Sequence, residues 1–307
     1  MKTPQQSYPS LAAALGVPEL YLKREDLHHF GSHKGRSIPL MIKNYHKDGR
    51  RDFVISSSGN AALAAILFIR DHNKNNTGDP IRLTIFVGEN IESQKLSRLQ
   101  SLITYHLSLI TLHQVARPKQ SAIQFSKEHS AVYLRQSTDD TALLGYHELA
   151  EELNHIPNLQ AIFVPTSSGT TAQALGEAFE TLSPAFAEAS AGKQKPQIHI
   201  VQTEAVHPIA ELCIKTGVAN VSSHSSIASA IVDKVALRKE KVADVIKASG
   251  GYGWIVSDDE IRDAMRLVKE TTGLDISPNS ALSIAGVEKA IVEYTWNGPI
   301  VCLITGA

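Results

Sequence analysis

The 307-residue chain has few cysteines, tryptophans and aromatic residues, with two Cys, two Trp and 6% Phe, Trp and Tyr together. Cys213 and Cys302 are far apart and have no metal-ligand spacing, so we interpret them as buried thiols in a reducing cytoplasm. No apolar run is long enough to span a bilayer, and the N-terminus lacks the apolar core of a signal peptide. Because 30 Lys and Arg face 31 Asp and Glu, no basic field would attract nucleic acid. We therefore expect a cytoplasmic protein without membrane or nucleic-acid partners.

Short apolar strands alternate with segments of helical spacing almost from end to end. This alternation is typical of α/β proteins, whose parallel sheets are covered by helices. The length is sufficient for two such domains. The strands that we expect are Glu19–Lys23, Phe53–Ser56, Arg82–Val87, Leu107–Leu112, Val132–Leu134, Ala161–Val164, Gln197–Gln202 and Ile300–Ile304.

Lys34 follows a Gly31-Ser32 turn and stands at the start of a predicted helix. A lone lysine is usually a solvated surface charge. A lysine that forms a Schiff base must instead be partly desolvated, so that its amine can be neutral near pH 7. The tight turn can point Lys34 into a cleft where this is achieved.

Two later segments also join a strand to a helix through small residues. The first contains Ser57, Ser58, Gly59 and Asn60, and the second runs from Ser167 to Thr171. Free backbone N–H groups at the start of a helix bind anions, and small side chains allow close approach. A capped turn without a ligand has the same composition. The first segment suits a carboxylate and the second a phosphate monoester.

Together these three segments resemble the fold-type II pyridoxal-phosphate (PLP) enzymes. "LKREDLHHFGSHKGR" resembles their lysine segment, "SSSGNAALAA" their asparagine loop, and "VPTSSGTT" their phosphate loop. The resemblance implies that Lys34 holds pyridoxal 5'-phosphate as a Schiff base. It also implies that Asn60 bonds the phenolic oxygen of the cofactor and that Ser57, Ser58, Gly59 and Asn60 receive the substrate carboxylate. The cofactor phosphate would be bound by Ser167, Ser168, Gly169, Thr170 and Thr171.

The family resemblance also implies the architecture. It comprises two three-layer αβα domains with mostly parallel sheets and the cofactor in the cleft between them. We expect the larger cofactor-binding domain at 1–36 and 141–307, and a smaller mobile domain at 37–140. A homodimer is also expected.

The last third is most similar to threonine synthases. The segments concerned are "SIASAI", "SGGYGWIVSDDEI", "GLDISPNSALSIAG" and "CLITG". Ser257 also has the position of a helix N-cap, with acids in the first turn after it. The resemblance implies that the Thr305 hydroxyl meets the pyridine nitrogen of the cofactor, where a strand-end residue is the alternative. A hydroxyl there makes the ring a weaker electron sink, suited to elimination and replacement.

Several positions depart from the threonine-synthase pattern. Gly35 replaces an Asp, Ala142 replaces the Arg that holds the substrate phosphate, and Ser277 replaces a Glu. A phosphorylated substrate would need another cation, and Arg36 is the nearest basic candidate on the presumed helix, unless it is a structural salt-bridge residue. The histidines near Lys34 have no spacing suited to one ion, so we expect no metal site.

The function that the resemblance implies is a carbon–oxygen lyase acting on a small amino acid. Its reaction would convert O-phosphohomoserine to threonine and phosphate. One alternative is a serine/threonine dehydratase or a cysteine synthase-like enzyme that replaces a group at Cβ. The departures also leave open a PLP-binding homologue without catalytic activity.

Overall fold

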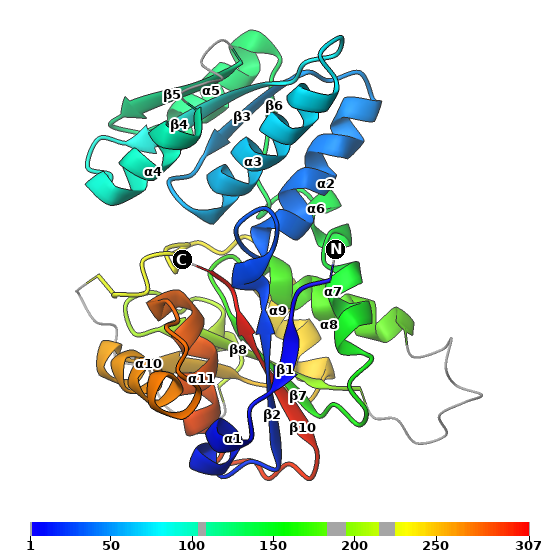
Figure 1. The fold of residues 1–307 in the computed structure, drawn as a ribbon, viewed down its shortest axis with the longest axis vertical. Helices are drawn as coiled ribbons and strands as arrows, with labels where there is room; N and C mark the ends of the chain where they lie inside the picture. Colours follow the sequence, from blue (N-terminus) through cyan, green and yellow to red (C-terminus); the bar gives the residue numbers. More distant parts are fainter. Residues whose placement is uncertain (1, 104–108, 183–194, 215–224, 307) are drawn as a thin grey trace. The chain divides into compact units, whose positions relative to one another are not determined.

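A computed structural model describes residues 2–103, 109–182, 195–214 and 225–306 (Figure 1). Contacts between Cα atoms divide the chain into unit 1, Met1–Leu27 and Tyr146–Ala307, and unit 2, His28–Gly145. We had expected boundaries at 36/37 and 140/141. The first of these would cut helix α2 (Lys34–Lys47) after its third residue. The second would separate α6 (Thr141–Leu144) from α2, which it contacts within unit 2.

Unit 1 is built on a six-stranded sheet in the order β1-β2-β10-β7-β8-β9. Only the β1–β2 pair is antiparallel among these strands. Every residue of β7 and β10 is buried, as expected for parallel strands covered on both faces. The elements of unit 1 are β1 (Gln5–Ser7), α1 (Pro9–Leu15), β2 (Glu19–Arg24), η1 (Glu25–Leu27), α7 (His147–Leu153), β7 (Ala161–Pro165), α8 (Thr170–Leu182), β8 (Gln197–Thr203), η4 (Ala210–Leu212), α9 (Lys239–Ala248), β9 (Gly253–Val256), α10 (Asp258–Thr272), α11 (Pro278–Ala290) and β10 (Pro299–Ile304).

Helices cover both faces of this sheet. On one face, α1, α10 and α11 bury Leu11, Ile261 and Leu282 against strand residues such as Leu22 and Phe163. Helices α8 and α9 pack against β8 and against each other, and α7 packs against α8. Burial of this apolar area supplies the main stabilisation of the unit.

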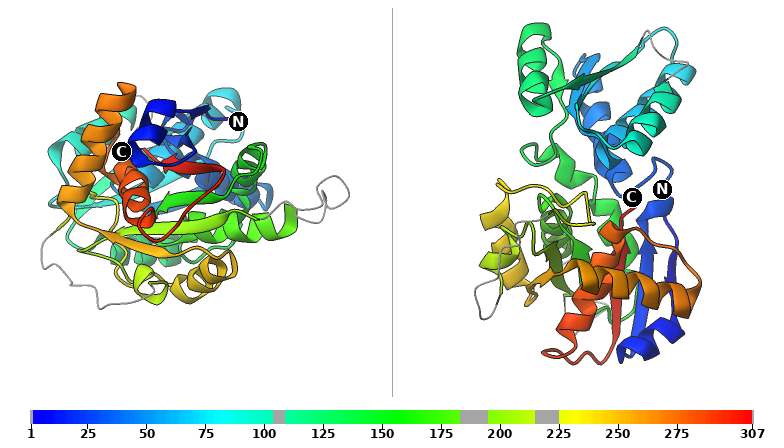
Figure 2. Two further views of the ribbon diagram at one scale, coloured as in Figure 1. Left: turned by 90° about the horizontal axis from the view of Figure 1, so that it is seen from below. Right: turned by 90° about the vertical axis from the view of Figure 1, so that its left-hand side faces the viewer.

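Unit 2 has a four-stranded sheet, β5-β4-β3-β6, in which all strands are parallel. Phe53 and Ile55 point to the face covered by α2, α3 and α4, while Val54 points to the face covered by α5. Figure 2 (right) shows α5 in green on one side of this sheet and α4 in cyan on the other. The remaining bounds are β3 (Asp52–Ser56), α3 (Asn60–Asn75), β4 (Arg82–Gly88), α4 (Ser93–Ile103), β5 (Ile110–Val115), α5 (Pro118–His129) and β6 (Val132–Tyr133).

The expected α/β fold with mostly parallel sheets is confirmed. Most expected strands start or end within a residue or two of the observed ones; β5 begins at Ile110, and positions 107 and 108 of the expected strand lie outside the described residues. The short strands β1 and β9 were not expected. Ser257 caps α10 as predicted, in a capping box with Glu260. In the part of the chain that the structure describes, no helix has the length and apolar character needed to cross a bilayer.

Candidate functional site

Lys34 is the first residue of α2, directly after the predicted turn. The Ser32 hydroxyl accepts a hydrogen bond from the Lys34 backbone N–H at 3.3 Å. Gly31 has φ +81°, and a Cβ atom there would lie 2.5 Å from Cδ2 of Leu63. Only glycine combines this backbone conformation with this close approach. The turn before Lys34 is therefore packed directly against α3.

Asn60 is the first residue of α3, and Leu63 lies in the first turn of that helix. Within the preceding loop, the Gly59 N–H donates to the Ser57 hydroxyl at 3.3 Å. Ser58 is exposed, and a Cβ at Gly59 would meet nothing within 4 Å. The loop thus leaves open space in front of a helix N-terminus, where an anion is favoured. Because Gly31 contacts Leu63, the structure brings the Lys34 turn and the Asn60 loop together within unit 2.

The glycine after Lys34 has a steric cause in this chain. A Cβ at Gly35 would lie 2.2 Å from Nδ1 of His28 and 2.9 Å from Cβ of Phe30. The His28 ring is buried, and its Nδ1 accepts the Phe30 backbone N–H at 3.2 Å. His28 therefore fills the space that a longer side chain at position 35 would need.

Ala142 is fully buried in the core of unit 2. The acid nearby serves the local fold, because Asp139 accepts the Thr141 backbone N–H at 2.9 Å and the Tyr45 hydroxyl at 2.8 Å. Burial, and then the bond to Asp139, raise the pKa of Tyr45 above its usual value. The structure thus provides no cation at position 142.

Arg36 lies in the first turn of α2 and is 5% exposed. The backbone of this turn is covered closely, since a Cβ at Gly145 would lie 2.4 Å from the Arg36 carbonyl oxygen. Its assignment to a substrate phosphate stays a prediction.

The loop Ser167–Thr171 in unit 1 joins β7 to α8, and its central residue, Gly169, has φ +85°. A Cβ there would lie 2.5 Å from Cγ2 of Val242, in the first turn of α9. Thr170 and Thr171 are buried at the start of α8, and the Ser168 and Thr170 hydroxyls lie 3.0 Å apart. Hydroxyls and free N–H groups of a first helical turn suit a phosphate. These residues fit the phosphate group of the expected cofactor.

Thr305 follows β10 and is buried, and it lies at the same end of the sheet of unit 1 as the Ser167–Thr171 loop, because β10 and β7 are parallel neighbours and both segments follow the carboxyl end of their strand. The next residue, Gly306, has φ +100° and donates its N–H to the Ser280 hydroxyl at 3.2 Å. Ser277 donates to the Gly306 carbonyl at 2.8 Å and caps α11 by accepting the Ser280 N–H. Ser277 thus holds the loop that carries Thr305.

Two buried basic residues were not identified from sequence, Lys23 and Arg238. Lys23 is 1% exposed and bonds the Glu152 carboxylate and the Thr3 carbonyl. Arg238 is buried beside α8, where its Nη1 lies 3.2 Å from Oε1 of Gln173. A single charge in a strand or at a helix start looks solvated in sequence, so only burial reveals these residues.

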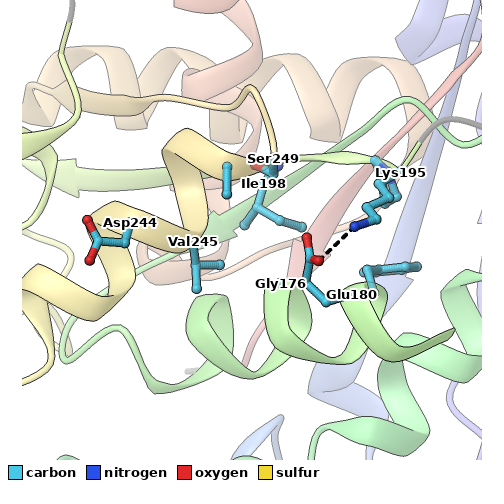
Figure 3. Close-up of a pocket in the computed structure, with 10 residues that line it drawn as sticks. Gly176, Glu180, Lys195, Ile198, Asp244, Val245 and Ser249 are labelled. Atoms are coloured by element: carbon cyan, nitrogen blue, oxygen red, sulfur yellow. Dashed lines mark hydrogen bonds and ion pairs between the residues drawn. The ribbon is translucent and has the colours of Figure 1, made fainter. Parts of the chain in front are cut away.

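The two cysteines and one cavity lie apart from the predicted residues. Burial raises the pKa of Cys213 to about 11 and that of Cys302 further, so both thiols are poor nucleophiles. A cavity of about 220 Å³ lies between the later turns of α8 and α9, and an ion pair between Lys195 and Glu180, 2.7 Å long, borders it (Figure 3). None of the predicted site residues lines this cavity.

Comparison with known proteins places this geometry in a family. The family model described as "Pyridoxal-phosphate dependent enzyme" matches residues 1–306. The chain is 26% identical over 314 residues to threonine synthase of Methanocaldococcus jannaschii, covering 99% of this chain and 74% of that protein. It is 22% identical over 315 residues to threonine synthase of Methanosarcina acetivorans, with coverage of 99% and 74%.

Solved structures share the fold at lower identity. Maize serine racemase superimposes with a TM-score of 0.78 at 20% identity, covering 100% of this chain and 88% of that one. The processed form of threonine deaminase isoform 2 from Solanum lycopersicum gives a TM-score of 0.77 at 19% identity, with coverage of 100% and 79%. With the family match over nearly the whole sequence, these findings show that the chain belongs to the pyridoxal-phosphate dependent enzymes of fold type II, whose cofactor is pyridoxal 5'-phosphate.

Proposed function

We propose that the chain is a threonine synthase-like lyase that converts O-phosphohomoserine and water to threonine and phosphate, with the phosphate leaving from Cγ and water adding at Cβ. The observation that carries the proposal is that Lys34 begins α2 directly after a turn that packs against α3, the helix that begins at Asn60. The similarity to two threonine synthases over 99% of the chain supports the reaction type.

Each loop has a role in this proposal. The Lys34 amine takes a proton from the α-carbon of the substrate and returns it during the later steps. Ser57–Asn60 hold the substrate carboxylate at the N-terminus of α3, while Ser167–Thr171 hold the cofactor phosphate. Thr305 would meet the ring nitrogen of the cofactor. When bound, the cofactor withdraws electrons from the substrate carbon atoms, which is the chemistry that elimination and replacement need.

Ala142 favours a second candidate, a serine/threonine dehydratase or an enzyme that replaces a group at Cβ. Ala142 is uncharged and fully buried, so this position supplies no cation to neutralise a substrate phosphate. Arg36 is the cation that we propose for this role if the substrate is phosphorylated. If the substrate carries no phosphate, the absence of a positive charge at position 142 does not weaken substrate binding.

A panel of four substrates separates the candidates: O-phosphohomoserine, threonine, serine and O-acetylserine. Release of phosphate from the first supports the threonine synthase reaction, and release of ammonia with a 2-oxo acid from threonine or serine supports the dehydratase. Replacement at Cβ of O-acetylserine is seen as release of acetate together with formation of the thioether from an added thiol. Cofactor binding without turnover on any substrate would contradict both and indicate a non-catalytic homologue.

The assignment of Lys34 is tested by the variant Lys34→Ala. We expect it to abolish turnover and the visible absorption band of the loaded protein, and borohydride should attach the cofactor to Lys34 in the parent chain only. The matched control is Lys47→Ala, because Lys47 is exposed at the other end of the same helix. A band that survives in Lys34→Ala would refute the assignment.

A further inference from the structure

Strand β6 is the neighbour of β3, the strand that leads into the Asn60 loop (Figure 1). The two strands are parallel, and directly after β6 the Leu134 N–H donates to the Val54 carbonyl at 2.9 Å. Parallel neighbours present their carboxyl ends, where ligands of α/β proteins bind, at one edge of the sheet. The residues that follow β6 therefore lie at the same edge of the sheet as the Asn60 loop.

The same segment contacts the helix that begins at Lys34. Gln136 is buried, and its side-chain amide donates to the Ser37 hydroxyl in the first turn of α2. The Ser37 hydroxyl in turn donates to the Lys34 carbonyl at 3.5 Å. Arg135 directly precedes Gln136, so its backbone lies one residue from a contact with this turn. The segment after β6 is thus next to both groups of residues that we assign to the substrate in unit 2.

The charge of Arg135 lies near the start of the Asn60 loop. Tyr133 ends β6, and its hydroxyl is hydrogen-bonded to the side chain of Ser56, the last residue before the loop. Burial raises the pKa of Tyr133, whereas the positive charge of Arg135 and the bond to Ser56 lower it. The guanidinium is therefore close enough to act on a hydroxyl that itself contacts the residue from which the loop starts.

Arg135 is also available to bind an anion. Its backbone is fixed, because its N–H donates to the Tyr133 carbonyl at 2.9 Å and its carbonyl accepts the Thr138 N–H at 3.1 Å. Its side chain is half-buried, and within residues 2–103, 109–182, 195–214 and 225–306 the guanidinium forms no ion pair or hydrogen bond. The carboxylate of Asp139, four residues further on, bonds the Thr141 N–H and the Tyr45 hydroxyl. A phosphate is the anion that the planar guanidinium binds best, through two parallel charge-assisted hydrogen bonds.

We propose that Arg135 binds the phosphate group of the substrate and supplies positive charge that Ala142 does not provide. A phosphate monoester carries about 1.5 to 2 negative charges near pH 7, so a single arginine neutralises it only in part. Arg135 acts together with Arg36 and is the more accessible of the two, since Arg36 is 5% exposed. This inference rests on the proposed function and names the residue that selects a phosphorylated substrate. Arg135 takes no part in proton transfer.

The test compares O-phospho-L-homoserine with L-homoserine, which lacks only the phosphate group. Each is mixed with the cofactor-loaded protein, and the Kd is taken from the change in the visible absorption band before turnover. In Arg135→Gln the Kd for O-phospho-L-homoserine should rise at least about tenfold, because charge-assisted hydrogen bonds are lost. The KM for phosphate release should rise with it. The Kd for L-homoserine should stay within about twofold of the parent value.

Two further variants complete the test. Arg50→Gln is the matched control, because Arg50 is an exposed arginine of the same unit that precedes β3, at the opposite edge of the sheet; it should change neither Kd. Arg135→Lys keeps the charge but loses the two parallel bonds, and should weaken only O-phospho-L-homoserine, by roughly two- to tenfold. This second substitution keeps the inference testable if Arg135→Gln does not fold.

The possible outcomes separate this inference from the proposed function. Equal weakening of both ligands in the Arg135 variants would place Arg135 at the substrate carboxylate or in the fold, and would overturn the proposal. Variants that bind both ligands as the parent does, while the parent releases phosphate, would refute the role of Arg135 alone. A parent that neither prefers O-phospho-L-homoserine nor releases phosphate would refute the proposed function and this inference with it.

Discussion

Protonation of His199 should destabilise unit 1 under mildly acidic conditions. The imidazole is fully buried, stacked on Phe163 with ring centroids 4.6 Å apart and planes 9° from parallel. Its Nδ1 accepts N–H groups from the Trp254 indole at 3.1 Å and the Tyr252 backbone at 3.3 Å. Since Nδ1 serves as an acceptor, the proton of the neutral ring resides on Nε2, which faces Oε1 of Gln197 at 3.3 Å. Charging the ring would place a proton where two donors already point.

The size of the effect follows from the shift in the histidine pKa. Burial lowers the pKa of His199 from 6.5 to about 3. Between these two values the unfolded chain binds a proton that the folded chain does not, so stability falls as pH falls through this window. At 1.36 kcal/mol per unit, lowering the pH from 6.5 to 5 removes about 2 kcal/mol. Above pH 6.5 the contribution is fully present.

His199→Asn removes the titration and keeps an acceptor oxygen close to the position of Nδ1. The variant should be less stable at pH 7, by about 1–3 kcal/mol for the lost packing. Its free energy of unfolding should, however, fall about 2 kcal/mol less than that of the parent when the pH goes from 7 to 5. This difference between the two changes isolates the histidine.

Urea unfolding followed by tryptophan fluorescence measures this difference locally. The chain has two tryptophans, and Trp254 and Trp296 have ring centroids 6.0 and 5.9 Å from that of His199. The cofactor concentration is kept equal in all samples. His155→Asn serves as the control, because His155 is exposed in the same unit. Equal pH dependence in the parent and His199→Asn would refute the reasoning.

Two other substitutions test buried contacts. Lys23→Met leaves the Glu152 carboxylate buried without its ammonium partner and should lower the free energy of unfolding, measured in urea, by about 3–5 kcal/mol. A double variant with Glu152→Gln should recover much of this loss. No recovery would contradict a paired role. Gly35→Ala places a Cβ against the His28 ring and should cost at least about 1 kcal/mol, whereas Gly78→Ala, where a Cβ meets nothing within 4 Å, should have little effect; equal melting temperatures for the two would contradict the steric argument.

The long apolar strands could be predicted from sequence because strands buried on both faces consist of consecutive apolar residues. Strand β10 is apolar at all six positions and lies where we expected it, extended by Pro299. Strands β1 and β9 contain three and four residues and owe their existence to pairing with β2 and β8. A pattern of so few residues carries no period, so sequence alone does not distinguish them from loops.

The buried polar residues show a different limit. His199 lies in the alternating run Gln197-Ile198-His199-Ile200, which predicts that the histidine points to solvent. Helices cover both faces of the sheet, so His199 is buried with its neighbours. Arg238 and Gln173 are 65 residues apart in the chain, and only the tertiary fold brings them together. The turns that carry Lys34 and Asn60 were predictable because glycine and serine mark them locally.

The residues that depart from the threonine-synthase pattern differ in their contacts with the rest of the fold, and these contacts affect which substrate the chain could bind. Ser277 holds the loop that carries Thr305 through its hydrogen bond to the Gly306 carbonyl. The His28 ring occupies the space that a side chain at position 35 would need. Ala142 is enclosed by the core of unit 2, where an arginine would be a buried charge in an apolar environment. The surroundings of these positions have therefore adapted to the residues present. The Asn60 loop keeps an open glycine in front of a helix N-terminus, and Ser277 still anchors the loop that carries Thr305, so of the proposed roles it is recognition of a substrate phosphate that the altered positions affect most.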